Sequence, residues 1–267
     1  MDQRSLDMFN KLKSFVMFTG HSRSGHSIIG ALLDAHPYIR IPHEYNLAYR
    51  YKEHIWETQD TLFKHLLDLS KNNAQEGRQR GPGGKYHVPG MWQGKHKELQ
   101  IIGDKEGPAN AYWFGKDPVF FDEMITKINL PIKFVCVYRN PYDNITTIEK
   151  LHKKNPWRPV RNLDEAIDDY FWYWDMNVHL IDQVEQDPRC DMLWIKQENF
   201  VKRPQYILRR LCDFLDIPAS NSYIKACSSI VFQKPRETRY NYPWTRQQIH
   251  RVKLLKQQYP WLRKYEY

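Results

Sequence analysis

Short apolar runs that end in glycine or in polar residues recur along the chain. Runs of four to eight apolar residues bounded by turn residues are typical of buried strands. These runs cover 14–20, 99–107, 132–141 and 190–200, with a shorter one at 38–42. Three of them end in polar or glycine tips, at Gly20, Asp104–Lys105 and Arg139.

Helical patterns separate the strand patterns. Apolar residues recur with the helical period, or in helix-length segments, at 27–35, 58–73, 163–187, 204–217 and 245–259, and Pro141 is placed to begin another helix. This alternation predicts an α/β fold with a mostly parallel sheet covered by helices on both faces. We see no internal repeat and no clear break, so we expect residues 1–267 to form one domain. Ligands bind beyond the carboxyl ends of such strands, so the three polar tips should share one site.

Composition narrows the class of ligand more than the class of protein. Hydrophobic residues make up 41% and charged residues 27% of the chain, as in ordinary globular proteins. The net charge of +9 favours an anionic ligand or partner.

Segment 77–97 contains six glycines and two prolines. We interpret it either as a solvated surface loop or as a flexible lid over bound substrate.

Cysteine spacing and the N-terminal residues indicate the compartment. The four cysteines form no C-x-x-C pair, so no zinc site is predicted; they are Cys136, Cys190, Cys212 and Cys227. The first residues lack the apolar segment of a signal peptide, and no segment is long enough to cross a membrane. We therefore expect a cytoplasmic protein. Neither the H-E-x-x-H nor the G-x-S-x-G motif occurs, and no nucleic-acid-binding module is recognisable.

The most specific pattern is the loop after the first strand, which reads GHSRSGHS at 20–27. Its glycines and final serine match a phosphate-binding loop, but His26 replaces the lysine of the ATP-binding version. Loop N–H groups and a helix N-terminus favour an anion, and Arg23 can add a planar bidentate charge. The alternative is a Gly/Ser-rich turn without a ligand. The candidate binding residues are Arg23, Ser24, Gly25, His26 and Ser27.

The stretch GHSRSGHSIIGALLDAHPYIRIPHE resembles the 5′-phosphosulfate loop of the P-loop sulfotransferases, which use 3′-phosphoadenosine-5′-phosphosulfate (PAPS). The loop arginine, LLDAHP and a later glutamate are most similar to the tyrosylprotein-sulfotransferase type. The resemblance implies a three-layer P-loop fold, PAPS as donor, the bisphosphate PAP as product and no required metal. In this family an arginine at a strand end and a hydroxyl eight residues later hold the 3′-phosphate. VCVYRNPYDNITT places Arg139 and Thr147 at these positions.

The same family often closes the 3′-phosphate site with a basic loop near the C-terminus. Segment 232–244, FQKPRETRYNYPW, is such a loop, although it lacks the Arg-Lys-Gly run of the cytosolic enzymes. The resemblance makes Lys234, Arg236 and Arg239 candidates, with the two arginines preferred. The alternative is a solvated basic loop.

Sulfuryl transfer needs a base for the acceptor's proton and cations for the charge that develops on oxygen. Glu44 follows Arg23 by 21 residues, the spacing of the base in the tyrosylprotein type, and is the expected base. His43 is the alternative. Lys105 matches a strand-end lysine directed at the sulfonate, with an ion pair to Asp104 or Glu106 as its alternative role. Arg23 is expected on the bridging oxygen and the 5′-phosphate.

These motifs predict a PAPS-dependent sulfotransferase that acts on a hydroxyl or amine. We expect a small hydroxylated or phenolic acceptor, with a glycan or a protein tyrosine as alternatives. Two other functions stay open, a Mg²⁺-dependent nucleotide kinase with an altered loop and a PAPS-binding protein without catalysis. We expect no nucleic-acid partner, and the sequence indicates no particular oligomeric state.

Overall fold

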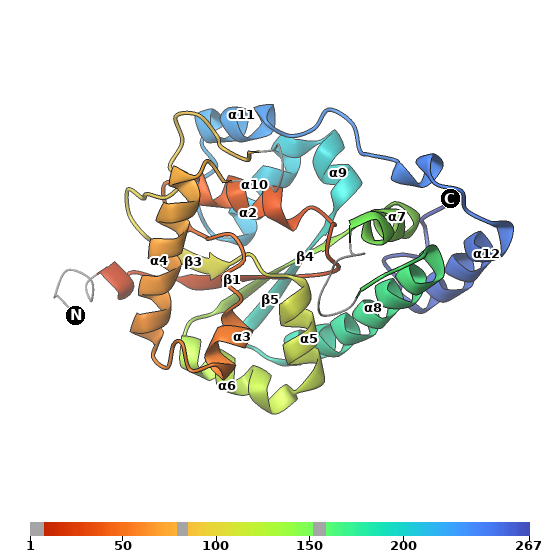
Figure 1. Ribbon diagram of the computed structural model, residues 1–267. Coiled ribbons are helices and arrows are strands. Elements are labelled where there is room, and N and C mark those ends of the chain that lie inside the picture. Colours follow the sequence, from red (N-terminus) through yellow and green to blue (C-terminus); the bar gives the residue numbers. More distant parts are fainter. Residues whose placement is uncertain (1–7, 79–84, 152–158) are drawn as a thin grey trace.

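Five parallel strands form one sheet at the centre of the molecule (Figure 1). The computed structural model describes residues 8–78, 85–151 and 159–267. The strand order is β2–β3–β1–β4–β5. The strands are β1 (Ser14–Thr19), β2 (Ile39–Arg40), β3 (Ile101–Asp104), β4 (Ile132–Tyr138) and β5 (Cys190–Lys196). The predicted α/β class with its parallel sheet is therefore confirmed.

The central position of β1 explains its unbroken apolar sequence. All six of its residues are buried. Val16 and Phe18 face one hydrophobic core, while Phe15 and Met17 face a second core on the opposite side of the sheet. A strand covered on both faces has no solvent side, so apolar and polar residues do not alternate along it.

Helices cover both faces of this sheet (Figure 1). One face packs against α2 (His26–Asp34), α9 (Gln197–Lys202), α10 (Pro204–Phe214) and α11 (Asn221–Ser229). The other packs against α3 (Leu47–Lys52), α4 (Gln59–Gln75), α5 (Pro108–Lys116), α6 (Pro118–Ile128) and part of α8 (Leu163–Gln186). A third core joins α8 to α7 (Pro141–Leu151) and α12 (Arg246–Leu255). In the described part of the chain, no helix combines the length and the apolarity that a membrane span needs.

The sequence patterns missed five short helices: α3, α5, α6, α9 and α11. Glycine and proline hid two of them, since Gly115 and Pro118 interrupt the apolar pattern between 108 and 128. Gly115 lies so close to α8 that a Cβ there would come within 2.2 Å of the Met176 carbonyl oxygen. This glycine is therefore needed for helix packing rather than for a turn.

Parts of the described glycine-rich segment pack against α2. Gln93 is buried, and its side-chain amide donates to the Ala31 carbonyl at 2.9 Å. Asp34 at the end of α2 pairs with buried Arg78 at 3.1 Å and accepts from the Gly94 N–H at 3.1 Å. Residues 79–84 lie outside the described residues. The described part is thus a structural cover, and a lid role for 77–97 stays a prediction.

Candidate active site at the carboxyl edge of the sheet

The loop between β1 and α2 forms a cradle of backbone N–H groups. Gly20 and Gly25 have φ values of 107° and 105°, and Arg23 between them has a φ of 66°. A Cβ on Gly20 would come within 2.3 Å of the Val137 carbonyl oxygen on β4, so only glycine fits there. The first N–H groups of α2 have no acceptor within the helix. The loop therefore has the geometry of an anion site, with the exposed Arg23 at its tip.

Two buried asparagines hold this loop in place. The Asn177 side-chain oxygen on α8 accepts from the Thr19 hydroxyl at 2.6 Å and from the Gly20 N–H at 2.8 Å. The Asn144 amide on α7 donates to the Ser22 carbonyl at 3.1 Å and approaches the Ser24 hydroxyl at 3.5 Å. Sequence reasoning missed both residues. The available signal was the amide of Asn177 among mostly apolar buried positions of α8, whereas the buried positions of α7 are of mixed polarity and do not mark Asn144.

His26 stands at the position of the missing lysine, and its ring lies against the end of β1. Its Nε2 donates to the Thr19 carbonyl at 2.9 Å, and a side chain on Gly107 would contact the ring. Burial lowers the pKa of His26 to about 4, although the Thr19 carbonyl opposes this shift. The ring is therefore neutral at physiological pH. The ring N–H is bonded to Thr19, so the backbone N–H of His26 is the group that can donate to an anion in the loop.

Glu44 and Lys105 form an ion pair at the ends of β2 and β3. Lys105 Nζ donates to Glu44 Oε1 at 2.6 Å, and His43 Nε2 lies 3.7 Å from the same oxygen. The Lys105 stem crosses α2 at Gly30, where a Cβ would come within 2.5 Å of its Cγ. The alternative pairing of this lysine with Asp104 or Glu106 does not occur among the described ion pairs.

The charges around this pair set the protonation of both candidate bases. Burial raises the pKa of Glu44, but the charge and hydrogen bond of Lys105, together with smaller contributions from neighbouring groups, outweigh this, and the net pKa is lowered. The charge of Arg23 acts in the same direction, as does that of His43 when its ring is protonated. Burial, followed by the charge of Lys105, lowers the pKa of His43 to about 4. At neutral pH Glu44 is thus ionised and His43 is neutral, so each can accept a proton.

Asp104 holds the turn that carries Glu44. Its two carboxylate oxygens accept from the Tyr45 N–H at 2.9 Å and the Leu47 N–H at 3.0 Å. Glu44 and Asn46 both have left-handed backbone, with φ values of 55° and 64°. Such conformations are strained for these residues and persist only when surrounding contacts impose them. Asp104 supplies those contacts, a role that its place next to Lys105 in the sequence did not reveal.

Glu106 adds a third carboxyl group to the same corner. It is buried, and burial raises its pKa to about 7, although the charge of Lys105 lowers it. The charges of Glu44 and Asp104 raise it further. Burial likewise raises the pKa of Asp104 to about 6, against the two backbone hydrogen bonds. One carboxyl group with a lowered pKa and two with raised pKa values therefore act on the charge of one ammonium.

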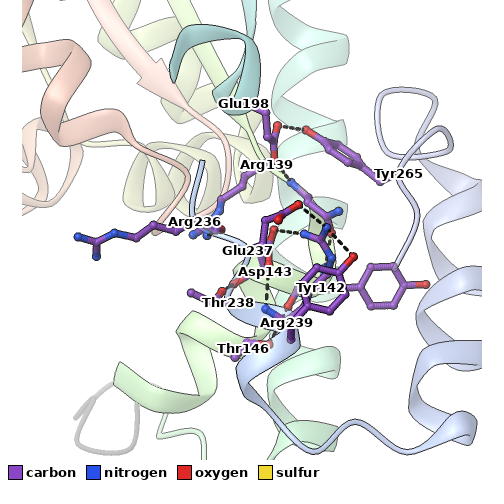
Figure 2. A network of polar contacts seen from close by, with 12 residues as sticks. Arg139, Tyr142, Asp143, Thr146, Glu198, Arg236, Glu237, Thr238, Arg239 and Tyr265 are labelled. Atoms are coloured by element: carbon purple, nitrogen blue, oxygen red, sulfur yellow. Dashed lines mark hydrogen bonds and ion pairs between the residues drawn. The ribbon is translucent and has the colours of Figure 1, made fainter. Parts of the chain in front are cut away.

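Arg139 lies at the corner between β4 and α7 and is buried (Figure 2). One terminal nitrogen donates to the Arg236 carbonyl at 2.6 Å, and the other lies 3.5 Å from the Thr147 hydroxyl. Its Nε has no hydrogen-bond partner among the described residues, and no carboxylate there lies within ion-pair distance. A buried guanidinium with only neutral partners is suited to hold an anion.

The basic loop 232–244 lies along α7, and its three candidate ligands differ in exposure and in pairing. Arg239 is buried and pairs with Asp143 at 2.5 Å and Glu237 at 2.9 Å, so it ties the loop to α7. The side chains of Lys234 and Arg236 are exposed, and the Arg236 guanidinium stacks 4.8 Å over the Phe232 ring. Arg236 and Lys234 are therefore more available to a ligand than Arg239, whose charge is already neutralised.

The sheet brings the three corners to one edge. β1 pairs with β3 on one side and β4 on the other, with Met17 beside Asp104 and Thr19 beside Cys136. The loop of Arg23 consequently lies between the Glu44–Lys105 pair and the Arg139 corner. Among the described residues, no group of three or more His, Cys, Asp or Glu side chains is arranged to hold a metal ion.

Comparisons with known proteins agree with this architecture. The family model described as the sulfotransferase family matches residues 16–221. Mouse sulfotransferase SULT7A1, solved in complex with PAP, is 11% identical with a TM-score of 0.52, over 96% of this chain and 89% of that chain. Sulfotransferase STF9 from Mycobacterium avium is also 11% identical with a TM-score of 0.52, over 99% of this chain and 80% of that chain. At these identities the two structures show the fold alone, and no curated protein matches the chain.

Proposed function

This chain belongs to the sulfotransferase family, and we propose that it transfers a sulfuryl group from PAPS to a hydroxyl or amine acceptor. The observation that carries the proposal is the pair of anion-binding corners on one sheet edge. One is the loop with Arg23, and the other is Arg139 without a carboxylate partner. PAPS has an anionic group at its 5′ and at its 3′ position, so a nucleotide of this kind engages both corners at once.

The residues of each corner fit the group assigned to it. Arg23 and the N–H groups of Ser24, Gly25, His26 and Ser27 would hold the 5′-phosphosulfate. The 3′-phosphate would lie against Arg139, including its unpaired buried Nε, and against Thr147, with Lys234 or Arg236 closing the site. Bound PAPS supplies the sulfuryl group. The PAP found in the mouse structure is the product expected from this donor.

Glu44 is the proposed base, with Lys105 as its charge partner. The low pKa of Glu44 keeps it ionised, so it can take the proton of an acceptor hydroxyl. Lys105 and Arg23 place positive charge where negative charge develops on oxygen. An interaction of Lys105 with the sulfonate of bound PAPS would weaken the ion pair between Lys105 and Glu44. The proton affinity of Glu44 would then rise. His43 is the alternative base, since its ring is neutral at physiological pH.

Partly exposed aromatic side chains beside the loop support a small acceptor with a flat apolar body. The Tyr173 ring on α8 lies 5.0 Å from the ring of His21 in the loop. Trp172 stands 4.9 Å from Tyr173, and Tyr112 on α5 is 5.8 Å from Trp172. Aromatic surfaces of this kind bind planar ligands well. A phenolic compound is therefore the acceptor that we propose, with a glycan or a protein tyrosine as outcomes to test against it.

The state of the cysteines supports a cytoplasmic location, which we also propose. All four are free and buried. Burial raises the pKa of Cys136 and of Cys190, the latter to about 12, so these thiols are unreactive. Free thiols are usual in a reducing compartment.

Calorimetry with two nucleotides tests the class of the protein. We expect PAP to bind tightly in the presence of EDTA and ATP to bind weakly with or without Mg²⁺. Tight binding of ATP that requires Mg²⁺ would instead identify a kinase. A screen of phenols, sugars and tyrosine peptides with ³⁵S-labelled PAPS then tests catalysis. Binding of PAP without transfer to any acceptor class would indicate a PAPS-binding protein that has lost its chemistry.

A further inference from the structure

The last residues of the chain pack against the corner that carries Arg139. Alternate residues of this corner contact the C-terminal segment 263–267, which we call the tail. The contacting pairs are Tyr138 with Tyr265, Asn140 with Glu266, and Tyr142 with Tyr267. Asn140 donates its side-chain amide to the Glu266 carbonyl at 2.9 Å. The tail thus contacts the corner at three alternate positions.

A buried lysine fixes the tail in this position. Lys256 is almost completely buried, and its ammonium donates to the carbonyls of Arg263, at 2.9 Å, and of Tyr265. It also lies 3.6 Å from a carboxylate oxygen of Glu266. A buried ammonium is tolerated only when such acceptors surround it. The tail therefore has one defined path across the corner.

The tail reaches the proposed site through Glu198 at the start of α9 (Figure 2). One Glu198 oxygen accepts from the Asn140 N–H at 2.7 Å, and the other accepts from the Tyr265 hydroxyl at 2.6 Å. Burial, together with the negative charge of Glu198, raises the pKa of Tyr265 well above its usual range. The phenol therefore stays protonated and remains a donor to Glu198.

These bonds explain why Arg139 has no carboxylate partner. The two carboxylates that act most strongly on its charge are Asp143 and Glu198. Asp143 is occupied by Arg239, and Glu198 is occupied by Asn140 and Tyr265. We propose that Tyr265 is a positioning residue that sets the preference for a 3′-phosphate. By binding Glu198 it keeps this carboxylate off Arg139, whose guanidinium then remains available to the nucleotide. The inference rests on the proposed function.

Tyr265→Phe tests this role because it removes the hydroxyl and keeps the ring. PAP and adenosine 5′-monophosphate, which lacks the 3′-phosphate, are titrated into the full-length wild type and the variant by calorimetry. We expect the affinity for PAP to fall roughly tenfold, the effect of compromising one hydrogen bond to a charged group. The affinity for the monophosphate should not change, which also shows that the variant is folded.

A second substitution separates this role from loss of packing. In the double variant Tyr265→Phe/Glu198→Gln the released side chain at 198 carries no charge that competes for Arg139, and Asp143 stays paired with Arg239, so the affinity for PAP should recover. A damaged corner would not be repaired by changing Glu198. Tyr206→Phe is the matched control, since Tyr206 is exposed on α10 and should leave both affinities at wild-type values.

The outcomes distinguish the two proposals. Equal binding of PAP and the monophosphate by the wild type would overturn the proposed function. A wild type that prefers PAP, with a Tyr265→Phe variant that keeps the whole preference, would overturn the role of Tyr265 alone. The role is also overturned if Tyr265→Phe loses affinity for PAP and the double variant shows no recovery.

Discussion

The ends of β3 and β4 lie on either side of the loop, and the cations at these two ends differ in whether a carboxylate pairs with them. At the end of β3, Lys105 is paired with Glu44 at 2.6 Å, and Asp104 and Glu106 lie close by. At the end of β4, Arg139 has no carboxylate within ion-pair distance among the described residues, and the nearby carboxylates Asp143 and Glu198 are bound by other groups. Both cations are buried and both lie on one sheet edge.

The contrast follows from what each corner is proposed to do. A base must bind and release a proton, so its proton affinity has to change during the reaction. The ion pair with Lys105 allows this change, because weakening the pair raises the proton affinity of Glu44. A permanent phosphate needs a cation whose charge is not already neutralised. In this proposal the carboxylates of the first corner take part in the chemistry, while those of the second corner are kept away from the ligand.

Glu44→Gln should have the largest effect, because it removes the proton acceptor and keeps the shape of the side chain. We expect turnover to fall roughly a thousandfold, within the range for a lost general base, and the affinity for PAP to stay nearly unchanged. Steady-state kinetics with labelled PAPS and calorimetry with PAP measure the two effects. Glu185→Gln on the exposed face of α8 is the matched control. Retained turnover would transfer the role of base to His43.

Arg139→Ala changes the corner at the end of β4 and should leave the corner of Glu44 and Lys105 unchanged. We expect the affinity for PAP to fall roughly a hundredfold, since a buried bidentate cation is lost. The affinity for adenosine 5′-monophosphate should change little, because that nucleotide has no group for this corner. Calorimetry with both ligands measures the difference. Equal losses for the two nucleotides would contradict the assignment of Arg139 to the 3′-phosphate.

Glu106→Gln tests the crowding of carboxyl groups around Lys105. The pKa of Glu106 is about 7 in the folded protein, against 4.5 for an ordinary glutamate, so the folded state binds this proton more tightly. The free energy of unfolding therefore falls as the pH rises from 4.5 to about 7. Removing the charge should raise the free energy of unfolding at pH 8 by about 3 kcal/mol and flatten this slope.

Urea denaturation of both proteins between pH 5 and pH 8 measures this effect. Part of the slope should remain in the variant, because Asp104, with its pKa of about 6, contributes in the same direction. A variant that is less stable than the wild type at pH 8 would show that the buried carboxylate is stabilised rather than strained.

Asp104→Asn is the smallest expected effect and tests the turn that carries Glu44. The amide can accept only one of the two backbone N–H bonds, so the strained turn loosens. We expect turnover to fall roughly tenfold, with an unchanged affinity for PAP. Adding Asp104→Asn to Glu44→Gln should cause no further loss, because the two residues act through one group. A multiplied loss would mean that Asp104 acts elsewhere.

Local patterns predicted the parts of the site that lie within one strand-loop-helix segment. The glycines of GHSRSGHS take the left-handed conformations that such a loop requires, and α7 begins at Pro141 as proline placement predicts. The eight-residue spacing between Arg139 and Thr147, which the family resemblance singled out, brings the arginine to the helical hydroxyl. In each case the interacting residues are close in the chain, so a short pattern contains the whole interaction.

Charge pairing was not predictable in the same way. Lys105 pairs with a glutamate 61 positions away, and Asp104 binds backbone groups 57 and 59 positions away instead of its neighbour. Arg239, a preferred phosphate ligand in the sequence, is occupied by Asp143, 96 positions earlier. These pairings depend on which elements become neighbours, which no pattern within one element records.

The sequence by itself thus determined the strands, most of the long helices, the loop and the residue types at each strand end, because these depend on local backbone preference and on burial along one element. The tertiary structure alone decided which cation keeps a carboxylate and which does not. That decision follows from the order β2–β3–β1–β4–β5 and from the path of the tail, since electrostatic pairing acts through space. The same residues arranged in another strand order would present other pairs.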